Sequence, residues 1–208
     1  MASPSPNQKS TFTLTASSSL DGHCTIVNGA SVFEISTRSI VSVSPFTGDE
    51  AEFNIAINKL FNGANPSATK AYDLIGKNAC VLMPSSLGQW FLCFDGEFPD
   101  PVAKAIDLLG KKTSNKMAMT DQSDAWFILA LTGPLIYHTL ERICPIDCSL
   151  PAMPIGATSR TMIEHLGTII VRRPDDENGD PCFWLLSARS SAASFLHVIT
   201  ASPPFTLG

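Results

Sequence analysis

Cys144 and Cys148 are the first residues whose types could support chemistry. Pro145, Ile146 and Asp147 separate them, whereas a redox-active pair at a helix start has two intervening residues. A structural zinc ion would need a second pair of ligands, which the sequence does not supply. The spacing therefore favours a structural role, in which Pro145 ends the preceding helix and Asp147 supports the loop. A thiol redox protein centred on Cys144 and Cys148 is an alternative to this role.

Glu164 and His165 form an adjacent acid and imidazole in a strand-like pattern, so we expect their side chains on opposite faces. The sequence contains no HExxH, and His23, His138 and His197 lack acidic or cysteine neighbours at ligand spacing. The patterns GxSxG, GxGxxG and GxxxxGK[ST] are also absent. The motifs therefore predict no catalytic residue, no cofactor-binding residue and no metal ligand in this chain.

Two arginines could hold a carboxylate or main-chain carbonyls in a fork. Arg160 lies at the start of a predicted strand, and Arg189 lies just before a predicted helix. We expect a structural clamp on the loop through Asp147, with a contact to a ligand or partner as the alternative. Small residues at 190–194 favour helix capping and permit close approach of another backbone.

The charge content is low for a protein of this size. Lys and Arg total 14 against 19 Asp and Glu, without clusters of positive charge, so nucleic acid is an unfavourable partner. Charged residues make up 16% of the chain, compared with about 25% in typical soluble domains. The deficit indicates that part of the surface is covered by other protein chains.

Nothing in the sequence predicts a membrane or secreted protein. The longest apolar runs, such as 125–131, are far shorter than the ~20 residues that span a bilayer, and no secretory signal is visible. The six cysteines do not follow a small disulfide framework. We expect reduced, mostly buried thiols in a cytoplasmic protein.

Periodicity places the elements of the first half. Apolar and polar residues alternate in a strand at 39–46, and helical spacing predicts a helix at 50–61 that ends at Asn62 and Gly63. Strands at 79–83 and 89–94 form a hairpin, and a second helix covers 101–109. Residues 65–78 are expected to be a loop.

The second half repeats this order. The prediction is a strand at 125–131, a helix from the turn at Gly133 and Pro134 through Ile143, and a final helix at 190–199. Between the helices we expect strands at 159–165 and 168–172, joined at Leu166 and Gly167, and a strand at 182–186. Each half carries a tryptophan in its strand pair, Trp90 or Trp184.

The predicted fold is α+β, with two similar βαββα-like halves forming one domain with mostly antiparallel sheets. We expect a flexible N-terminal arm at 1–24, a single domain at 25–201 and a C-terminal tail at 202–208. The pseudo-repeats cover about 38–112 and 123–201.

An ordered series of short matches relates the second half to one known family. The matching residues are 123–126, 131–134, 144–147, 154–156, 160–161, Gly167, Ile170, Arg172, Phe183, 185–186 and 189–190. On this series the chain resembles the gamma subunit of heterotetrameric sarcosine oxidase. The first half is similar more loosely, through Ser42, Val43, Gly48 and 88–90.

The resemblance implies a fold related to the folate-binding region of the glycine cleavage T-protein. It also implies a non-catalytic role in assembly with alpha, beta and delta subunits. Such a complex demethylates sarcosine oxidatively to glycine and passes the one-carbon unit to tetrahydrofolate. Its other subunits carry FAD, FMN, NAD, tetrahydrofolate and zinc, so the resemblance implies no cofactor in this chain.

Two features depart from that family: Cys148 replaces a common leucine, and the N-terminal arm is long and rich in serine. They leave open a subunit of a related N-methyl amino acid dehydrogenase. Another alternative is a free-standing, folate-binding protein like an aminomethyltransferase. That protein would need an acid for the pterin ring, for which only Asp124 and Glu164 are candidates.

Overall fold

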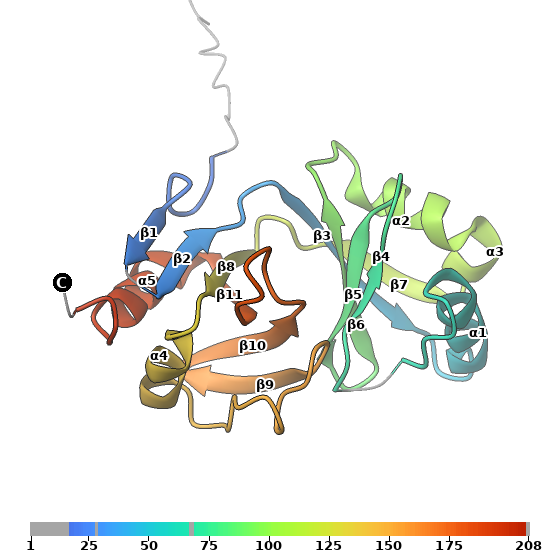
Figure 1. Ribbon diagram of the computed structural model, residues 1–208. Helices are drawn as coiled ribbons and strands as arrows, with labels where there is room; N and C mark the ends of the chain where they lie inside the picture. The colour runs from blue at the N-terminus through green and yellow to red at the C-terminus, as the bar shows by residue number, and fades with distance from the viewer. Residues whose placement is uncertain (1–16, 28, 67–68, 207–208) are drawn as a thin grey trace, which may run out of the picture.

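Two antiparallel sheets form the framework of the protein (Figure 1). The computed structural model describes residues 17–27, 29–66 and 69–206. The first sheet has the order β4 (Tyr72–Leu74), β5 (Cys80–Ser86), β6 (Gln89–Asp95), β3 (Arg38–Pro45) and β7 (Met117–Asp121). The second has the order β9 (Thr158–Ile163), β10 (Leu166–Arg173), β11 (Cys182–Ala188), β8 (Trp126–Thr132), β2 (Ala30–Glu34) and β1 (Cys24–Val27).

Helices cover the outer face of each sheet, which gives four layers in the order helices, sheet, sheet, helices (Figure 1). The first sheet is covered by α1 (Glu50–Leu60), α2 (Pro101–Leu109) and α3 (Lys111–Ser114). The second is covered by α4 (Ile136–Ile143) and α5 (Ala192–Thr200), which follows a short 3-10 helix, η1 (Arg189–Ser191). The predicted α+β class and mostly antiparallel sheets are confirmed.

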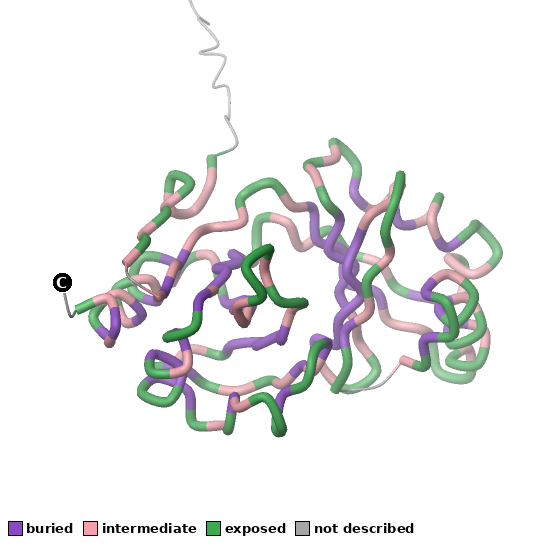
Figure 2. Tube along the Cα trace, in the orientation of Figure 1, coloured by how far each residue is buried: buried purple, intermediate pink, exposed green. Residues whose placement is uncertain are grey.

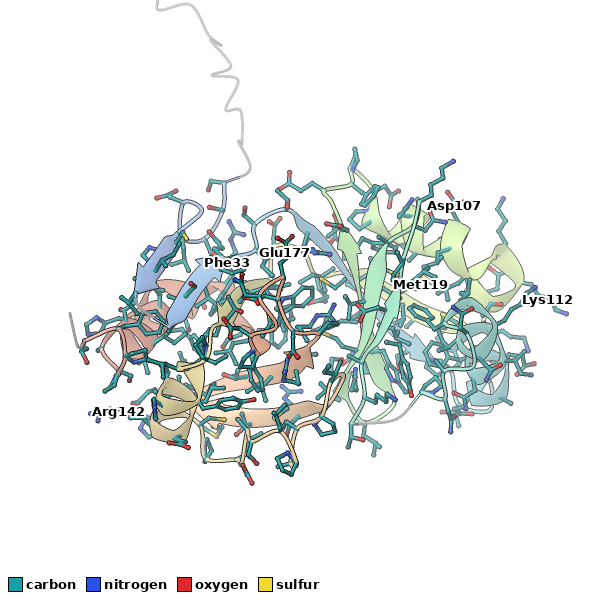
Figure 3. The ribbon with its side chains drawn as sticks, in the orientation of Figure 1. Phe33, Asp107, Lys112, Met119, Arg142 and Glu177 are labelled. Atoms are coloured by element: carbon teal, nitrogen blue, oxygen red, sulfur yellow. The ribbon has the colours of Figure 1, made fainter. Side chains whose placement is uncertain are left out.

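Both faces of the central strands are buried (Figure 2). In β8, Phe127 and Leu129 pack toward α4 and α5, whereas Ile128 and Ala130 pack against the first sheet. Side chains from both sheets fill the space between them (Figure 3). This arrangement explains why 125–131 is a continuous apolar run, because a strand with a single buried face would alternate.

Local signals fix the ends of the helices. Pro101 occupies the first turn of α2, where a missing N–H is harmless. Asp100 caps this helix by accepting a hydrogen bond from the Ala103 N–H at 2.8 Å. Gly110, with φ of 81°, follows the last residue.

The chain contains two units with the same connectivity. The first runs β3, α1, β4, β5, β6, α2, and the second runs β8, α4, β9, β10, β11, α5. In each sheet the four strands of the unit have the same spatial order. The expected loop at 65–78 was wrong in part, because β4 lies inside it and pairs with β5.

Each sheet is completed by a strand that precedes the other unit. β2 leads into β3 but pairs with β8, whereas β7 leads into β8 but pairs with β3. We call residues 35–37 and 122–125 the crossovers, because there the chain passes from one sheet to the other. Neither unit supplies all the strands of its own sheet.

The sheets are also joined along their opposite edges. The Ala71 N–H donates to the Gly156 carbonyl at 2.7 Å, and the Thr158 N–H donates to the Thr69 carbonyl at 2.8 Å. Gly156 has φ of 87°, and a β-carbon there would lie 3.1 Å from the Ala71 carbonyl oxygen. Glycine is therefore required for this close approach.

Several predicted details were wrong. The turn between β9 and β10 lies at Glu164 and His165, which have φ of 46° and 68°, and not at Leu166 and Gly167. The side chains of Glu164 and His165 therefore do not alternate across a strand, contrary to the prediction. The strands β1, β2 and β7 and the short helix α3 lie in segments where no element was predicted.

The two tryptophans are not equivalent. Trp90 packs toward α1, with its ring 4.6 Å from that of Phe53, whereas Trp184 packs between the sheets. Adjacent residues of a strand face opposite layers. A shift of one position between the two repeats therefore places the two tryptophans in different environments. The shared tryptophan was therefore not a marker of the repeat.

The predicted N-terminal arm lies only partly within the described residues. Residues 1–16 lie outside them, and so do residues 207–208 of the predicted tail. Residues 17–22 contact β2 through hydrogen bonds to Glu34.

Ser123 connects one crossover to the first sheet. Its hydroxyl accepts a hydrogen bond from the buried Ile40 N–H at 3.0 Å and donates to Asp121 at 2.6 Å. The Gln122 N–H donates to the Ile40 carbonyl at 2.8 Å. The crossover is thus bound to β3 by both main chain and side chain.

We predict that Ser123→Ala destabilises the protein by about 1–2 kcal/mol, because the Ile40 N–H loses its acceptor. Urea unfolding followed by circular dichroism measures the change in free energy. The control is Ser194→Ala, at an exposed position of α5. Equal stability of the two variants would contradict the assigned role of Ser123.

Candidate functional site

A cavity of about 370 Å³ lies where the two crossovers meet. Its lining comes from the N-terminal segment 17–19, both crossovers with their flanking strand ends, the segment before α2, and η1. We call it the central cavity. Its charged lining residues are Glu34, Arg38, Glu97, Asp121, Asp124 and Arg189.

Glu34 holds the N-terminal segment at this cavity. Its carboxylate accepts hydrogen bonds from the Ser19 N–H at 2.9 Å, the Ser19 hydroxyl at 2.5 Å and the Gly22 N–H at 2.9 Å. Burial alone would raise the pKa of Glu34, but these hydrogen bonds together outweigh burial and lower it. The ionised form of Glu34 is therefore the form that stabilises the segment.

The three residues predicted to form a clamp lie apart from one another, and each makes a separate contact. The Arg189 guanidinium donates to the Ser17 carbonyl, which ties η1 to the N-terminal segment. Arg160 donates to the Ser85 carbonyl at 3.0 Å and connects β9 to β5. Asp147 accepts from the Ser149 N–H at 2.8 Å, so it contacts its own loop and neither arginine.

Sequence reasoning missed a second group of arginines, around Trp184. The guanidinium carbon of Arg38 lies 5.1 Å from the centre of the Trp184 ring, and that of Arg173 lies 4.3 Å away. Arg38 pairs with Asp95 at 3.4 Å, and Arg173 pairs with Asp73 at 2.6 Å. Since β3 and β10 belong to different sheets, Trp184 and its two arginines connect the sheets.

Arg172 is the largest fully buried polar residue described. Its side chain is 1% exposed, and it donates to the carbonyls of Arg173 and Cys182 and to Asp175. The Arg172 Nε atom is buried without a hydrogen-bond partner among the described residues. Two arginines at the end of an apolar strand, followed closely by Asp175 and Asp176, were the available sequence signal.

Most charged groups of the central cavity are engaged in structural contacts. Glu34 holds the N-terminal segment, Arg38 contacts Trp184 and Asp95, and Asp121 accepts from Ser123. Of the described acids in the lining, Glu97 and Asp124 have no side-chain hydrogen bond or ion pair to another described residue. Asp124 is one of the two acids that the sequence nominated for a pterin ring. The other, Glu164, lies in the β9–β10 turn.

Possible metal ligands do not cluster in the part of the chain that the structure describes. No group of three or more His, Cys, Asp or Glu side chains there could hold an ion. Cys144 and Cys148, by contrast, lie in contact and line a separate cavity.

Comparisons with known proteins relate the fold, but not the sequence, to characterised structures. No family model matches the sequence, and no curated protein matches it. A chain of heterotetrameric sarcosine oxidase from Corynebacterium sp. U-96 matches with a TM-score of 0.64 and 16% identity. The match covers 83% of this chain and 82% of that chain.

A second solved structure is glycine cleavage system aminomethyltransferase T from Bartonella henselae. It matches with a TM-score of 0.58 and 13% identity, over 83% of this chain and 45% of that chain. The chain has a T-protein-like fold. The resemblance stated from sequence is thus confirmed for the fold, and this chain spans less than half of the aminomethyltransferase.

The helices that cover the two sheets are short. None of the helices described over 17–27, 29–66 and 69–206 is long and apolar enough to cross a membrane.

We predict that Glu34→Gln loosens residues 17–22 and lowers the free energy of unfolding by about 1–2 kcal/mol at pH 7, because charged hydrogen bonds are lost. Hydrogen exchange measures the protection of the main-chain N–H groups at 17–22, and urea unfolding measures the free energy of unfolding. The control is Glu177→Gln, an exposed acid in the loop before β11 (Figure 3).

The pH dependence of this difference has a defined sign. The pKa of Glu34 lies below its ordinary value of 4.5 in the folded protein. The contribution is therefore complete above pH 4.5 and disappears as the pH falls through the folded-state pKa. The stability difference between wild type and Glu34→Gln should narrow in acid, and a constant difference would contradict this role.

Proposed function

We propose that this chain is the non-catalytic gamma-type subunit of a heterotetrameric sarcosine oxidase complex. Such a complex demethylates sarcosine oxidatively to glycine and transfers the one-carbon unit to tetrahydrofolate. The chain contributes to the assembly and stability of the complex, and its partners are the alpha, beta and delta subunits. On this proposal the complex is cytoplasmic.

The observation that carries the proposal is the extent of the two structural matches. The matched sarcosine oxidase chain is covered to 82%, and this chain to 83%, so the two chains have similar lengths. Only 45% of the aminomethyltransferase is covered by the same share of this chain. A chain of this size therefore corresponds better to a small subunit than to a complete T-protein-like enzyme.

The composition of the surface supports an assembled state. Only 16% of the residues are charged, and several large apolar side chains are exposed. The most exposed are Leu87 at 94%, Ile75 at 91%, Ile26 at 73% and Ile55 at 69%. Contact with partner subunits would remove such side chains from water.

The cofactors of the complex belong to its other subunits on this proposal. FAD, FMN, NAD, tetrahydrofolate and zinc would be held there, and no residue of this chain is assigned to them. The complex could also be a related N-methyl amino acid dehydrogenase, which the same kind of subunit would serve.

A free-standing folate-binding protein is the second candidate, favoured by the position of Asp124. This acid lines the central cavity together with Trp126, so a carboxylate and an aromatic ring are available to one ligand. The cavity volume of about 370 Å³ lies at the small end of the range of ~300–1,000 Å³ for ligand pockets.

We predict that co-expression with alpha, beta and delta subunits gives a complex that contains this chain and survives gel filtration. Obligate interfaces commonly bury more than about 1,600 Å² of surface, which is enough for stable association. The control is co-expression of the other three subunits alone, which tests whether assembly needs this chain. Isolation of this chain only as a stable monomer would contradict the proposal.

We also predict that the isolated chain shows no saturable binding of tetrahydrofolate in a calorimetric titration, because folate belongs to another subunit. Saturable binding that is abolished by Asp124→Asn would instead establish the second candidate. The matched control is Asp107→Asn, an exposed acid on α2 outside the central cavity (Figure 3).

A further inference from the structure

The loop after α4 brings two thiols into contact. Cys144 directly follows α4, and Cys148 lies four residues further along. Both residues are only 6% exposed and belong to the core between α4, α5 and the second sheet. The Cys148 thiol donates a hydrogen bond to the Ile146 carbonyl at 3.5 Å, and the Cys144 and Cys148 side chains interact with each other. The loop thus achieves a contact that the spacing of the two residues did not predict.

The two thiols have different chemical character. Interaction with the Cys148 side chain is the main cause that lowers the pKa of Cys144 to about 7, and the Ile146 main chain assists, although burial opposes the shift. The same interaction, together with burial, raises the pKa of Cys148. Cys144 is therefore the thiol of the pair that ionises more readily, and Cys148 retains its proton.

A cavity of about 520 Å³ gives small molecules access to the pair, since both cysteines line it. Tyr137 also lines this cavity, and its hydroxyl is buried without a hydrogen-bond partner among the described residues. The charged residues in the lining are Glu141 on α4 and Asp147 in the loop. Both cysteines therefore border one cavity that is large enough for a small molecule.

The other buried cysteines differ from this pair. Cys80 and Cys93 lie on neighbouring strands, but they face opposite layers of the core. Burial raises the pKa of each to about 12, so both remain protonated thiols at neutral pH.

We propose that Cys144 and Cys148 form a thiol pair that hydrogen peroxide oxidises to an intramolecular disulfide. This modification site is separate from the assembly role and does not depend on it. Two observations carry the proposal: the two cysteines lie together in one core cluster with interacting side chains, and both line one cavity.

The reaction proceeds in two balanced steps. The Cys144 thiolate attacks one oxygen of hydrogen peroxide, so that an S–O bond forms, the O–O bond breaks, and hydroxide leaves and takes up a proton to become water. Cys148 then attacks the Cys144 sulfenic acid; the S–S bond forms, and the second oxygen leaves as water with the Cys148 proton. Two thiols and one peroxide give one disulfide and two waters, and a thiol reductant restores the pair.

Peptide mass spectrometry of the full chain, after treatment with hydrogen peroxide, tests the proposal. In the wild type we expect a Cys144–Cys148 disulfide, seen as the loss of two hydrogen atoms that dithiothreitol reverses. In Cys148→Ala the sulfenic acid has no resolving thiol, so dimedone should label Cys144. Cys148→Val provides a second variant that keeps apolar volume in the core, and Cys24→Ala is the control.

A second measurement distinguishes activation of Cys144 by Cys148 from a purely structural role of Cys148. Loss of the Cys148 thiol returns the pKa of Cys144 toward the ordinary 9.0, so iodoacetamide should alkylate Cys144 about tenfold more slowly at pH 7 in both Cys148 variants. Cys24→Ala should leave disulfide formation and the rate at Cys144 unchanged. Equal rates at Cys144 in wild type and the Cys148 variants, or no disulfide with excess peroxide, would overturn the proposal.

Discussion

The exchange of β2 and β7 between the two units is the constraint on which the rest of the structure depends. Each sheet takes one strand from the segment that precedes the other unit, so the crossovers must run between the sheets. The main-chain hydrogen bonds of these strands cannot form within either unit alone. Duplication and exchange therefore make one domain of two similar halves, and the central cavity lies where the crossovers meet.

Apolar burial alone would let the two sheets slide past each other, because dispersion and hydrophobic forces are weakly directional. Polar contacts fix their relative position. Arg38 contacts Trp184 of the other sheet, and Arg173 pairs with Asp73. Arg160 donates to the Ser85 carbonyl, and the Gly156 carbonyl accepts from the Ala71 N–H. Each contact joins residues distant in sequence, so each carries information about the arrangement of the sheets that hydrophobic contacts lack.

The sequence predicted elements whose signals are local and missed those that depend on a distant partner. The Asp100 cap, Pro101 and Gly110 defined α2, and double-sided burial made 125–131 a clear strand. β4 has three residues, and β7 is stabilised by pairing with β3, so neither shows strong periodicity of its own. The roles of Glu34 and Arg38 were equally hidden, because their partners come from segments that only the fold brings near.

The central cavity illustrates how a fold shared with an enzyme can serve as a structural joint. A carboxylate that must accept several main-chain hydrogen bonds, as Glu34 does, is held in its ionised form and is a poor proton donor or acceptor near neutral pH. The Arg38 guanidinium lies over the ring of buried Trp184, so it is not free to bind a substrate. The polar groups that strand exchange gathers at the crossovers are thus largely used to hold the crossovers in place. Glu97 and Asp124 remain for a ligand or a partner, and only Asp124 lies on a crossover.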